Sequence, residues 1–117
     1  GDMVTDAVFS PDGSRVACLG KENEKWTVAV DGNQWDEYDM AWQPVFSPDG
    51  KNVAAKVEKN GRYTVVVNGK PLKEEFATVW NPVFSPDSDK ILIKTIETGQ
   101  NENKYFRRVM SIADITG

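Results

Sequence analysis

Histidine is absent from this 117-residue chain, and cysteine occurs once, as Cys18. Without imidazole the chain lacks the commonest general acid–base group and the commonest nitrogen ligand of zinc and haem iron. A single thiol forms no internal disulfide, no Cys-x-x-Cys redox pair and no cysteine-ligated cluster. These absences predict a protein that is not an enzyme and that has no catalytic residues, no metal site and no cofactor of its own.

Clustered positive charge is also scarce. The chain has 18 acidic and 14 basic residues, a formal net charge of −4, and no basic run longer than the pair Arg107–Arg108. Nucleic acids and anionic membrane surfaces attract basic patches, so we expect neither as a partner. No apolar run approaches the roughly 20 residues of a bilayer-spanning helix, so we expect no direct membrane insertion.

What the sequence does contain is a tandem repeat. The string Phe-Ser-Pro-Asp occurs at Phe9–Asp12, Phe46–Asp49 and Phe84–Asp87, so the period is 37 and then 38 residues. A fixed period of this size is typical of solenoids and propellers. We therefore interpret residues 1–117 as a single repeat domain with repeats at about 6–42, 43–80 and 81–117.

Each repeat contains short β-branched and aromatic runs bounded by turn residues, which is the pattern of strands. Ser-Pro-Asp-Gly predicts a type I turn ending in a left-handed glycine, and Asn60-Gly61 predicts a type I′ hairpin. Fourth strands are predicted at 35–38 and 72–76. Four strands of about five residues with short turns fill the period. The predicted fold is all-β, with three tandem four-stranded antiparallel blade-like repeats forming a partial β-propeller.

The third repeat departs from this pattern in three ways. Its outer strand is incomplete, because only 111–115 remain to supply it. Ser88 replaces the turn glycine, which predicts an irregular turn since a left-handed non-glycine residue costs about 1 kcal/mol. The loop at 99–104 is longer by about four residues than its counterparts.

The Phe-Ser-Pro-Asp-Gly turn, followed by Val-Ala and an aromatic-Thr-Val-x-Val strand, resembles the TolB-type (WD40-like, PD40) propeller repeat. The Gly-His of the true WD40 signature is missing, and Trp35-Asp36 lies in the predicted fourth strand instead of closing the third. The blocks Trp26–Gly32, Trp42–Gly50 and Tyr105–Val109 are similar to the TmcD family, the tryptophan-rich subunit of a transmembrane electron-transfer complex (Tmc) of sulfate-reducing bacteria. This resemblance implies a cytoplasmic accessory subunit without cofactors, beside a cytochrome c, an iron–sulfur protein and a membrane cytochrome.

Several side chains recur once per repeat and invite a functional interpretation. Asp12, Asp49 and Asp87 would share one rim, where they either hold turns or bind a cation; the turn interpretation is favoured. The adjacent serines, Ser10, Ser47 and Ser85, have no histidine to activate them. Cys18 matches Ala55 and Ile93 and is expected to be a buried small apolar residue.

The residues that vary between repeats are the better candidates for binding. Trp42 and Trp80 replace Thr5, and they either pack between repeats or present a flat aromatic surface to a protein partner. Asn101 and Asn103 lie in the longer loop, and these four residues are the candidate partner contacts. Lys56 and Lys94 stand in a predicted strand, where each needs a carboxylate partner or an exit to solvent.

Two classes of function remain open at this point. The first is a non-catalytic protein-interaction scaffold of a membrane-associated electron-transfer complex. The second is a propeller that supports or gates a hydrolase, and a TolB-like envelope scaffold, which would be periplasmic, is a further variant. Because propellers close with about four to eight blades, three repeats leave open edges. We therefore expect two copies to associate, either into a six-bladed ring or edge to edge.

Overall fold

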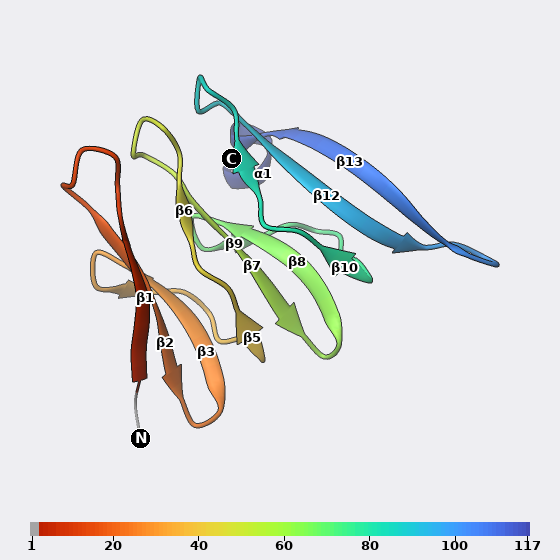
Figure 1. The fold of residues 1–117 in the computed structure, drawn as a ribbon, viewed down its shortest axis with the longest axis horizontal. Helices are drawn as coiled ribbons and strands as arrows, with labels where there is room; N and C mark the ends of the chain where they lie inside the picture. Colours follow the sequence, from red (N-terminus) through yellow and green to blue (C-terminus); the bar gives the residue numbers. More distant parts are fainter. Residues whose placement is uncertain (1–2) are drawn as a thin grey trace.

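A computed structural model describes residues 3–117 of the chain. Within these residues it is almost entirely β-structure (Figure 1). The strands are β1 (Met3–Phe9), β2 (Val16–Glu22), β3 (Lys25–Val30), β4 (Asn33–Gln34), β5 (Met40–Ala41), β6 (Val45–Phe46), β7 (Val53–Lys59), β8 (Arg62–Val67), β9 (Lys70–Pro71), β10 (Thr78–Val79), β11 (Val83–Phe84), β12 (Lys90–Thr98) and β13 (Asn103–Ser111), followed by the helix α1 (Ile112–Thr116).

The strands form three antiparallel sheets, one for each copy of the repeated turn. The first sheet has the order β1-β2-β3-β4. The middle sheet contains β5 to β9, and the third contains β10 to β13. The sheets lie side by side in chain order, and the turn that follows the opening strand of each sheet lies at the same end of the molecule (Figure 1). The all-β, antiparallel class predicted from the repeats is confirmed.

The opening strand of each sheet is interrupted at the same place. In the middle sheet β5 and β6 both pair with β7, and in the third sheet β10 and β11 both pair with β12. In β1 the register shifts between Thr5 and Val8. Pro44 and Pro82 lie in the two gaps. Proline has no N–H to donate to a ladder, so it is tolerated at such an edge and ends the pairing locally.

The outer strand of the first sheet is shorter than predicted and begins earlier in the chain. β4 covers Asn33–Gln34, while 35–37 are irregular and Tyr38 returns only as an isolated bridge to Trp26. The middle sheet repeats this arrangement with β9 and a bridge from Phe76 to Tyr63. The prediction failed because acidic and lysine residues are poor strand formers. The Thr27 hydroxyl also donates to the carbonyl of Trp35 at 2.8 Å in place of a ladder bond.

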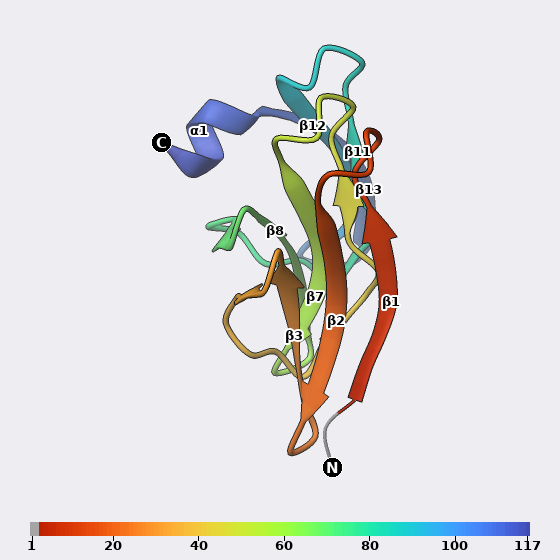
Figure 2. The ribbon, with the colours of Figure 1, turned by 90° about the vertical axis from the view of Figure 1, so that its left-hand side faces the viewer.

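The third sheet has no outer strand within residues 3–117. The predicted strand at 111–115 is wrong, because these residues lead into α1, which Figure 2 shows projecting to one side of the sheets. Ile112 is buried against the middle sheet, and its N–H donates to the Asp89 carbonyl at 2.8 Å. Burial of one isoleucine against a neighbouring sheet thus determines the local structure. Among the described residues no helix is long and apolar enough to cross a bilayer.

The core lies between the sheets and is divided into two layers. Successive residues of a strand point to opposite faces, so one strand contributes to both layers. In β7, Val53, Ala55 and Val57 pack toward the first sheet, whereas Ala54 packs toward the third. The middle sheet is therefore buried on both faces. The absence of a polar side in its strand at 63–67 is confirmed, since Thr64 is buried together with the valines.

The turns follow the sequence closely, with one exception. Asn60 and Gly61 have φ angles of 53° and 79°, as a type I′ hairpin requires. Ser88 is left-handed at φ 65°, and its N–H donates to Ser85 O at 2.9 Å, which is the distance found for Gly50 and Ser47. The expected irregular turn is therefore wrong. The buried Ser88 hydroxyl accepts a hydrogen bond from the Asp49 N–H at 3.1 Å, and this bond offsets the backbone strain.

This balance predicts different changes in the free energy of unfolding for two substitutions at Ser88. Ser88→Ala keeps the left-handed strain and removes the acceptor for the Asp49 N–H, so we expect a loss of about 1–2 kcal/mol in the free energy of unfolding. Ser88→Gly removes the same acceptor but relieves about 1 kcal/mol of strain, so we expect a change near zero. Urea unfolding measures both, and equal destabilisation by the two variants would contradict the account.

Candidate functional site

The three recurring aspartates are parts of turns. Ser47 Oγ donates to Asp49 Oδ1 at 2.6 Å, and the same carboxylate oxygen accepts the Lys51 N–H at 2.9 Å. Ser47 Oγ in turn accepts the Asn52 N–H at 3.0 Å. The pairs Ser10–Asp12 and Ser85–Asp87 repeat these bonds. The turn interpretation is confirmed, and the serine hydroxyls are engaged in holding the turns.

These hydrogen bonds favour the charged carboxylates. The backbone N–H of Ser14, followed by its hydroxyl, lowers the pKa of Asp12 to about 2. The pKa values of Asp49 and Asp87 are also lowered, in each case first by the neighbouring serine hydroxyl. Residues 3–117 contain no group of three or more histidine, cysteine, aspartate or glutamate side chains placed to hold a metal ion.

Trp42 is half-buried against Lys56 and Tyr63 of its own sheet, and Tyr63 in turn packs against the core layer between the middle and third sheets. The ring centroid of Trp42 lies 6.0 Å from that of Tyr63, and the Lys56 ammonium sits 4.4 Å from the Trp42 centroid and 5.4 Å from the Tyr63 centroid. Burial lowers the pKa of Lys56. The sequence left open a carboxylate partner and an exit to solvent for this lysine. The structure instead places two aromatic faces beside the cation, and they stabilise it by cation–π attraction. We call Trp42, Lys56 and Tyr63 the covered triad.

Trp80, Lys94 and Tyr105 repeat this arrangement on the third sheet, and we call them the open triad. The Trp80 and Tyr105 rings meet edge to face with centroids 5.9 Å apart. The Trp80 N–H donates to the Lys94 carbonyl at 3.0 Å, as Trp42 does to Lys56. Here, however, Trp80 is 45% and Tyr105 52% exposed. The same residue pattern is therefore packed in one repeat and accessible in the next.

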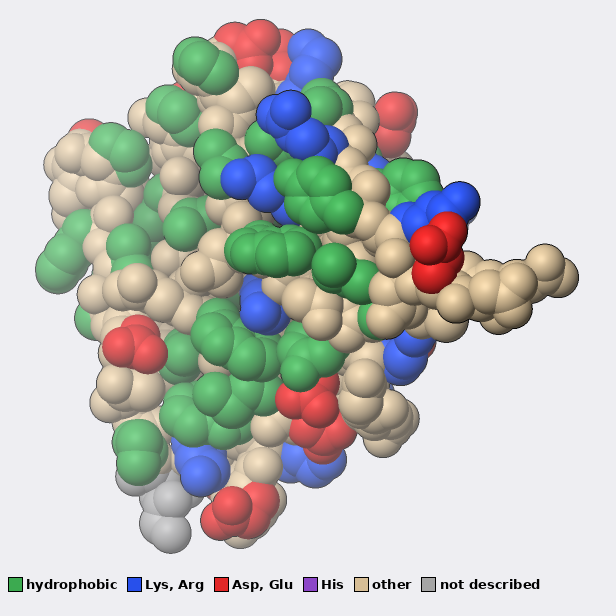
Figure 3. Space-filling model, turned by 45° about the vertical axis from the view of Figure 1, so that its right-hand side comes forward, with side chains coloured by type: hydrophobic (Ala, Val, Ile, Leu, Met, Phe, Trp, Pro, Cys, Tyr) green, Lys and Arg blue, Asp and Glu red, His purple; other side chains and the backbone are tan. Residues whose placement is uncertain are grey.

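The open triad is part of a larger surface on the third sheet, which we call the end face. Cross-strand partners point to the same face, so Leu92 and Val109 join the triad, as does Arg107 opposite Lys94. Val83 of β11 also pairs with Leu92, on the edge of β12 opposite to β13. Figure 3, which brings the β12–β13 side forward, shows hydrophobic side chains gathered there beside lysine and arginine. On the end face the basic pair Lys94–Arg107 lies between the apolar pairs Leu92–Val109 and Ile96–Tyr105.

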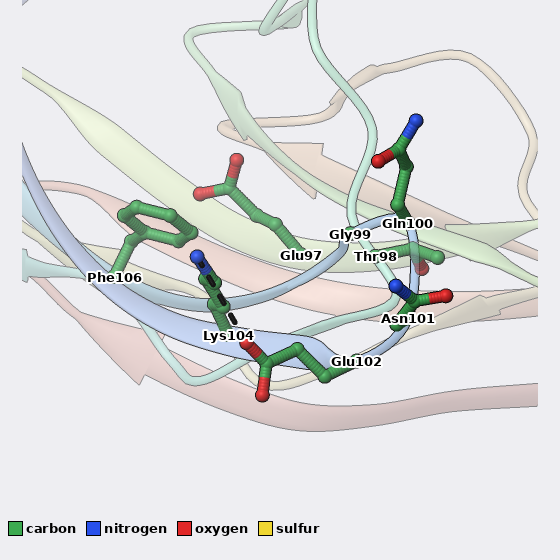
Figure 4. A pocket seen from close by; sticks show the side chains of 8 residues that line it. All are labelled: Glu97, Thr98, Gly99, Gln100, Asn101, Glu102, Lys104 and Phe106. Atoms are coloured by element: carbon green, nitrogen blue, oxygen red, sulfur yellow. Dashed lines mark ion pairs between the residues drawn. The ribbon is translucent and has the colours of Figure 1, made fainter.

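The hairpin between β12 and β13 is a second distinctive surface. Both strands have nine residues, and of the predicted long loop at 99–104 only 103 and 104 belong to β13, whereas 99–102 form the turn. Asn101 lies in the turn, and Asn103 is the first residue of β13. An open hollow of about 420 Å³ lies here (Figure 4), and its lining residues are Glu97, Thr98, Gly99, Gln100, Asn101, Glu102, Lys104 and Phe106. We call this region the hairpin tip.

The four candidate contact residues thus occupy different places. Trp42 is half-buried in packing, Trp80 is on the end face, and Asn101 and Asn103 are at the hairpin tip. Sequence reasoning missed the exposure of Tyr105 and Val109, because their counterparts in the other repeats pack under a following sheet. Cys18 was expected to be buried but is half-buried, since no sheet covers its face of the first sheet in residues 3–117.

Comparison with protein-family models gives no match for this chain, and comparison with curated proteins gives none either.

The two tryptophans should differ in their contribution to stability. Trp42→Ala removes a half-buried ring together with its contacts to Lys56 and Tyr63, so we expect a loss of about 2–3 kcal/mol in the free energy of unfolding. Trp80→Ala removes an exposed ring and should cost less than about 1 kcal/mol in dilute solution. Urea unfolding of both variants measures this, and equal losses would contradict the difference in burial between the two rings.

The turn carboxylates predict a loss of stability in acid. The pKa of Asp12 is about 2 in the folded chain and 3.8 ordinarily, so the unfolded state takes up its proton first as pH falls. This contribution to stability is present above about pH 4 and is lost as pH falls toward about 2. Asp12→Asn keeps an oxygen acceptor but does not titrate, so its urea midpoint should vary less with pH. An unchanged pH dependence would refute the assignment.

Proposed function

We propose that this chain is a non-catalytic β-propeller-type scaffold that acts through protein–protein contacts. The observation that carries the proposal is the end face, where Trp80, Val83, Tyr105 and Val109 are exposed together. Scattered exposed apolar residues are ordinary on a protein surface, but a contiguous patch rimmed by polar groups is typical of an interaction site. Tryptophan and tyrosine are also the residues most often found at the energetic centres of interfaces.

The arrangement of the sheets supports the partial-propeller part of the proposal. Successive sheets bury equivalent faces against each other, and each opens with an interrupted edge strand. The repeat places comparable turns at one end of every sheet (Figure 1). Propellers of the TolB type are built from such units, and their function lies in the surfaces that the repeats present. This is a role that requires no catalytic group.

We further propose that the scaffold belongs to an accessory subunit of a membrane-associated electron-transfer complex. The sequence blocks similar to the TmcD family support this placement. In such a complex the chain contributes surface, while other subunits carry the haem and iron–sulfur groups. The hairpin tip is the surface that we assign to these subunits. It is where the third repeat extends beyond the other two, and it exposes Asn101, Asn103 and Phe106.

The test is binding to the purified cytochrome c, iron–sulfur and membrane cytochrome subunits, measured by calorimetry at low salt. We expect one of them to bind the wild-type chain. Replacing residues 99–102 by Asn-Gly, together with Asn103→Ala, removes the hairpin tip while keeping a two-residue turn. We expect this variant to bind at least about tenfold more weakly, a loss of about 1.4 kcal/mol.

The matched control is Glu24→Gly, which alters the corresponding turn of the first sheet. Glu24 is left-handed at φ 66°, so glycine fits there without strain. This control should bind like the wild type. If the wild-type chain binds none of the three subunits, the placement in an electron-transfer complex is wrong.

A further inference from the structure

The two ends of the stack of sheets are related by the repeat. Val4 of the first sheet occupies the position of Ala41 in the middle sheet and of Val79 in the third. Ala41 and Val79 are fully buried, because the preceding sheet covers them, whereas Val4 is 75% exposed. The residue type is apolar in all three repeats. The difference lies in what covers the side chain: within the described residues a preceding sheet packs on Ala41 and Val79, whereas none packs on Val4.

Other positions on this side of the first sheet show the same difference. Phe9 is 66% exposed, while its counterparts Phe46 and Phe84 pack against the two core layers. Cys18 is half-buried, and its counterparts, Ala55 and Ile93, are fully buried. The register places these side chains on one face, since Val4 pairs with Gly20 and Phe9 with Val16. We call the surface formed by Val4, Phe9, Val16, Cys18 and Gly20 the front face.

The end face is the opposite half of the same kind of contact. Val109 is 65% exposed, although Val30 and Val67, which occupy its position in the other sheets, are buried under the sheet that follows. The open triad stands where the covered triad stands in the middle sheet. Within residues 3–117, no preceding sheet packs on the front face and no following sheet packs on the end face.

We propose that the end face of one copy of this chain packs on the front face of a second copy, head to tail. The contact would repeat the two sheet-to-sheet contacts already present within the chain, so it continues an existing interface. Two copies joined in this way at both ends form a closed ring of six sheets, in which no front or end face remains open. The inference rests on the proposed scaffold function, because it names the partner of the end face.

Residue sizes on the two faces compensate for each other. The end face is bulkier than the equivalent face of the middle sheet, with Leu92 in place of Ala54 and Arg107 in place of Val65. On the front face Gly20 is smaller than its counterparts Val57 and Thr95, although Val4 is larger than its counterpart Ala41. Interiors pack at nearly constant density, so a large side chain on one face needs a small one opposite.

The charges on the two faces are also complementary. Lys94 and Arg107 make the end face positive, whereas Glu22 on the front face is exposed and acidic. Lys25 lies on the same side as Glu22 but is ion-paired with Asp39. Opposite charges favour this face-to-face pairing over the pairing of two end faces, because like charges across an interface are repulsive.

The experiment is the mass of the purified chain by light scattering and sedimentation across a wide range of concentrations. We expect a species of twice 13.1 kDa for the wild type. Val4→Asp damages the front face and Tyr105→Asp the end face. Each should raise the dissociation constant at least about 100-fold, because an unpaired carboxylate would be buried in the contact.

Each variant has a matched control on the neighbouring residue of the same strand. Met3→Asp and Phe106→Asp also replace exposed apolar side chains, but these point to the opposite faces of β1 and β13. Both controls should remain dimeric. Circular dichroism checks that all four variants are folded, and substitutions at exposed positions leave the core layers intact.

Mixing the two damaged variants gives the sharpest result. Val4→Asp leaves the end face unaltered, and Tyr105→Asp leaves the front face unaltered. An equimolar mixture should therefore form a one-to-one complex through the single contact between these two unaltered faces. A pairing of two like faces would instead be sensitive to only one of the substitutions. A monomeric wild type, a mass that grows beyond two copies, or failure of the mixture to associate would each overturn the proposal.

The outcome is separable from that of the binding test with redox subunits. A monomeric chain that binds those subunits would overturn head-to-tail pairing and leave the scaffold function in place. A dimer that binds none of them would overturn the placement in an electron-transfer complex and leave the pairing in place. A monomer without partners would overturn both.

Discussion

Within residues 3–117, the apolar faces of the sheets are covered mainly by neighbouring sheets, and Ile112 of α1 adds to the layer on the middle sheet. The middle sheet shows what this requires, because Ala54 and Ala55, adjacent in β7, are both fully buried in different core layers. Burial of apolar area is the main favourable term in folding, so each sheet depends on its neighbours for stability. The turns serve this packing. Their Ser–Asp hydrogen bonds fix the start of each second strand and hold equivalent side chains in register.

The same constraint gives identical residue patterns different roles. Trp42 and Trp80 occupy equivalent positions, each beside a lysine and a tyrosine, yet one is half-buried and the other is exposed. The two repeats differ around these residues, since Leu92 and Arg107 stand where the middle sheet has Ala54 and Val65. A further difference, within the described residues, is that a following sheet packs on the middle sheet and none packs over Trp80. This difference in covering accounts for the exposure of Trp80.

The sequence was most informative where structure is local. The period, the Ser-Pro-Asp turns, the Asn60-Gly61 hairpin and the two-sided burial of the strand at 63–67 all follow from short-range pattern. The sequence was less informative where the local structure depends on contacts with a neighbouring sheet. The left-handed Ser88 depends on the Asp49 N–H across a sheet boundary, and α1 depends on burial of Ile112 against the middle sheet. Likewise, the candidate residues were found from their differences between repeats, but their exposure depends on the stacking order.

Amide hydrogen exchange tests most directly the claim that each sheet is protected by its neighbours. Exchange would be followed in β1, β7 and β13 at two protein concentrations, one well below and one well above the dissociation constant of the pair. The account predicts that β7 is slowest at both, because its sheet is covered on both faces. It also predicts that protection of β1 and β13 rises together at the higher concentration. Protection that rises in only one of these end strands, or in neither, would contradict it.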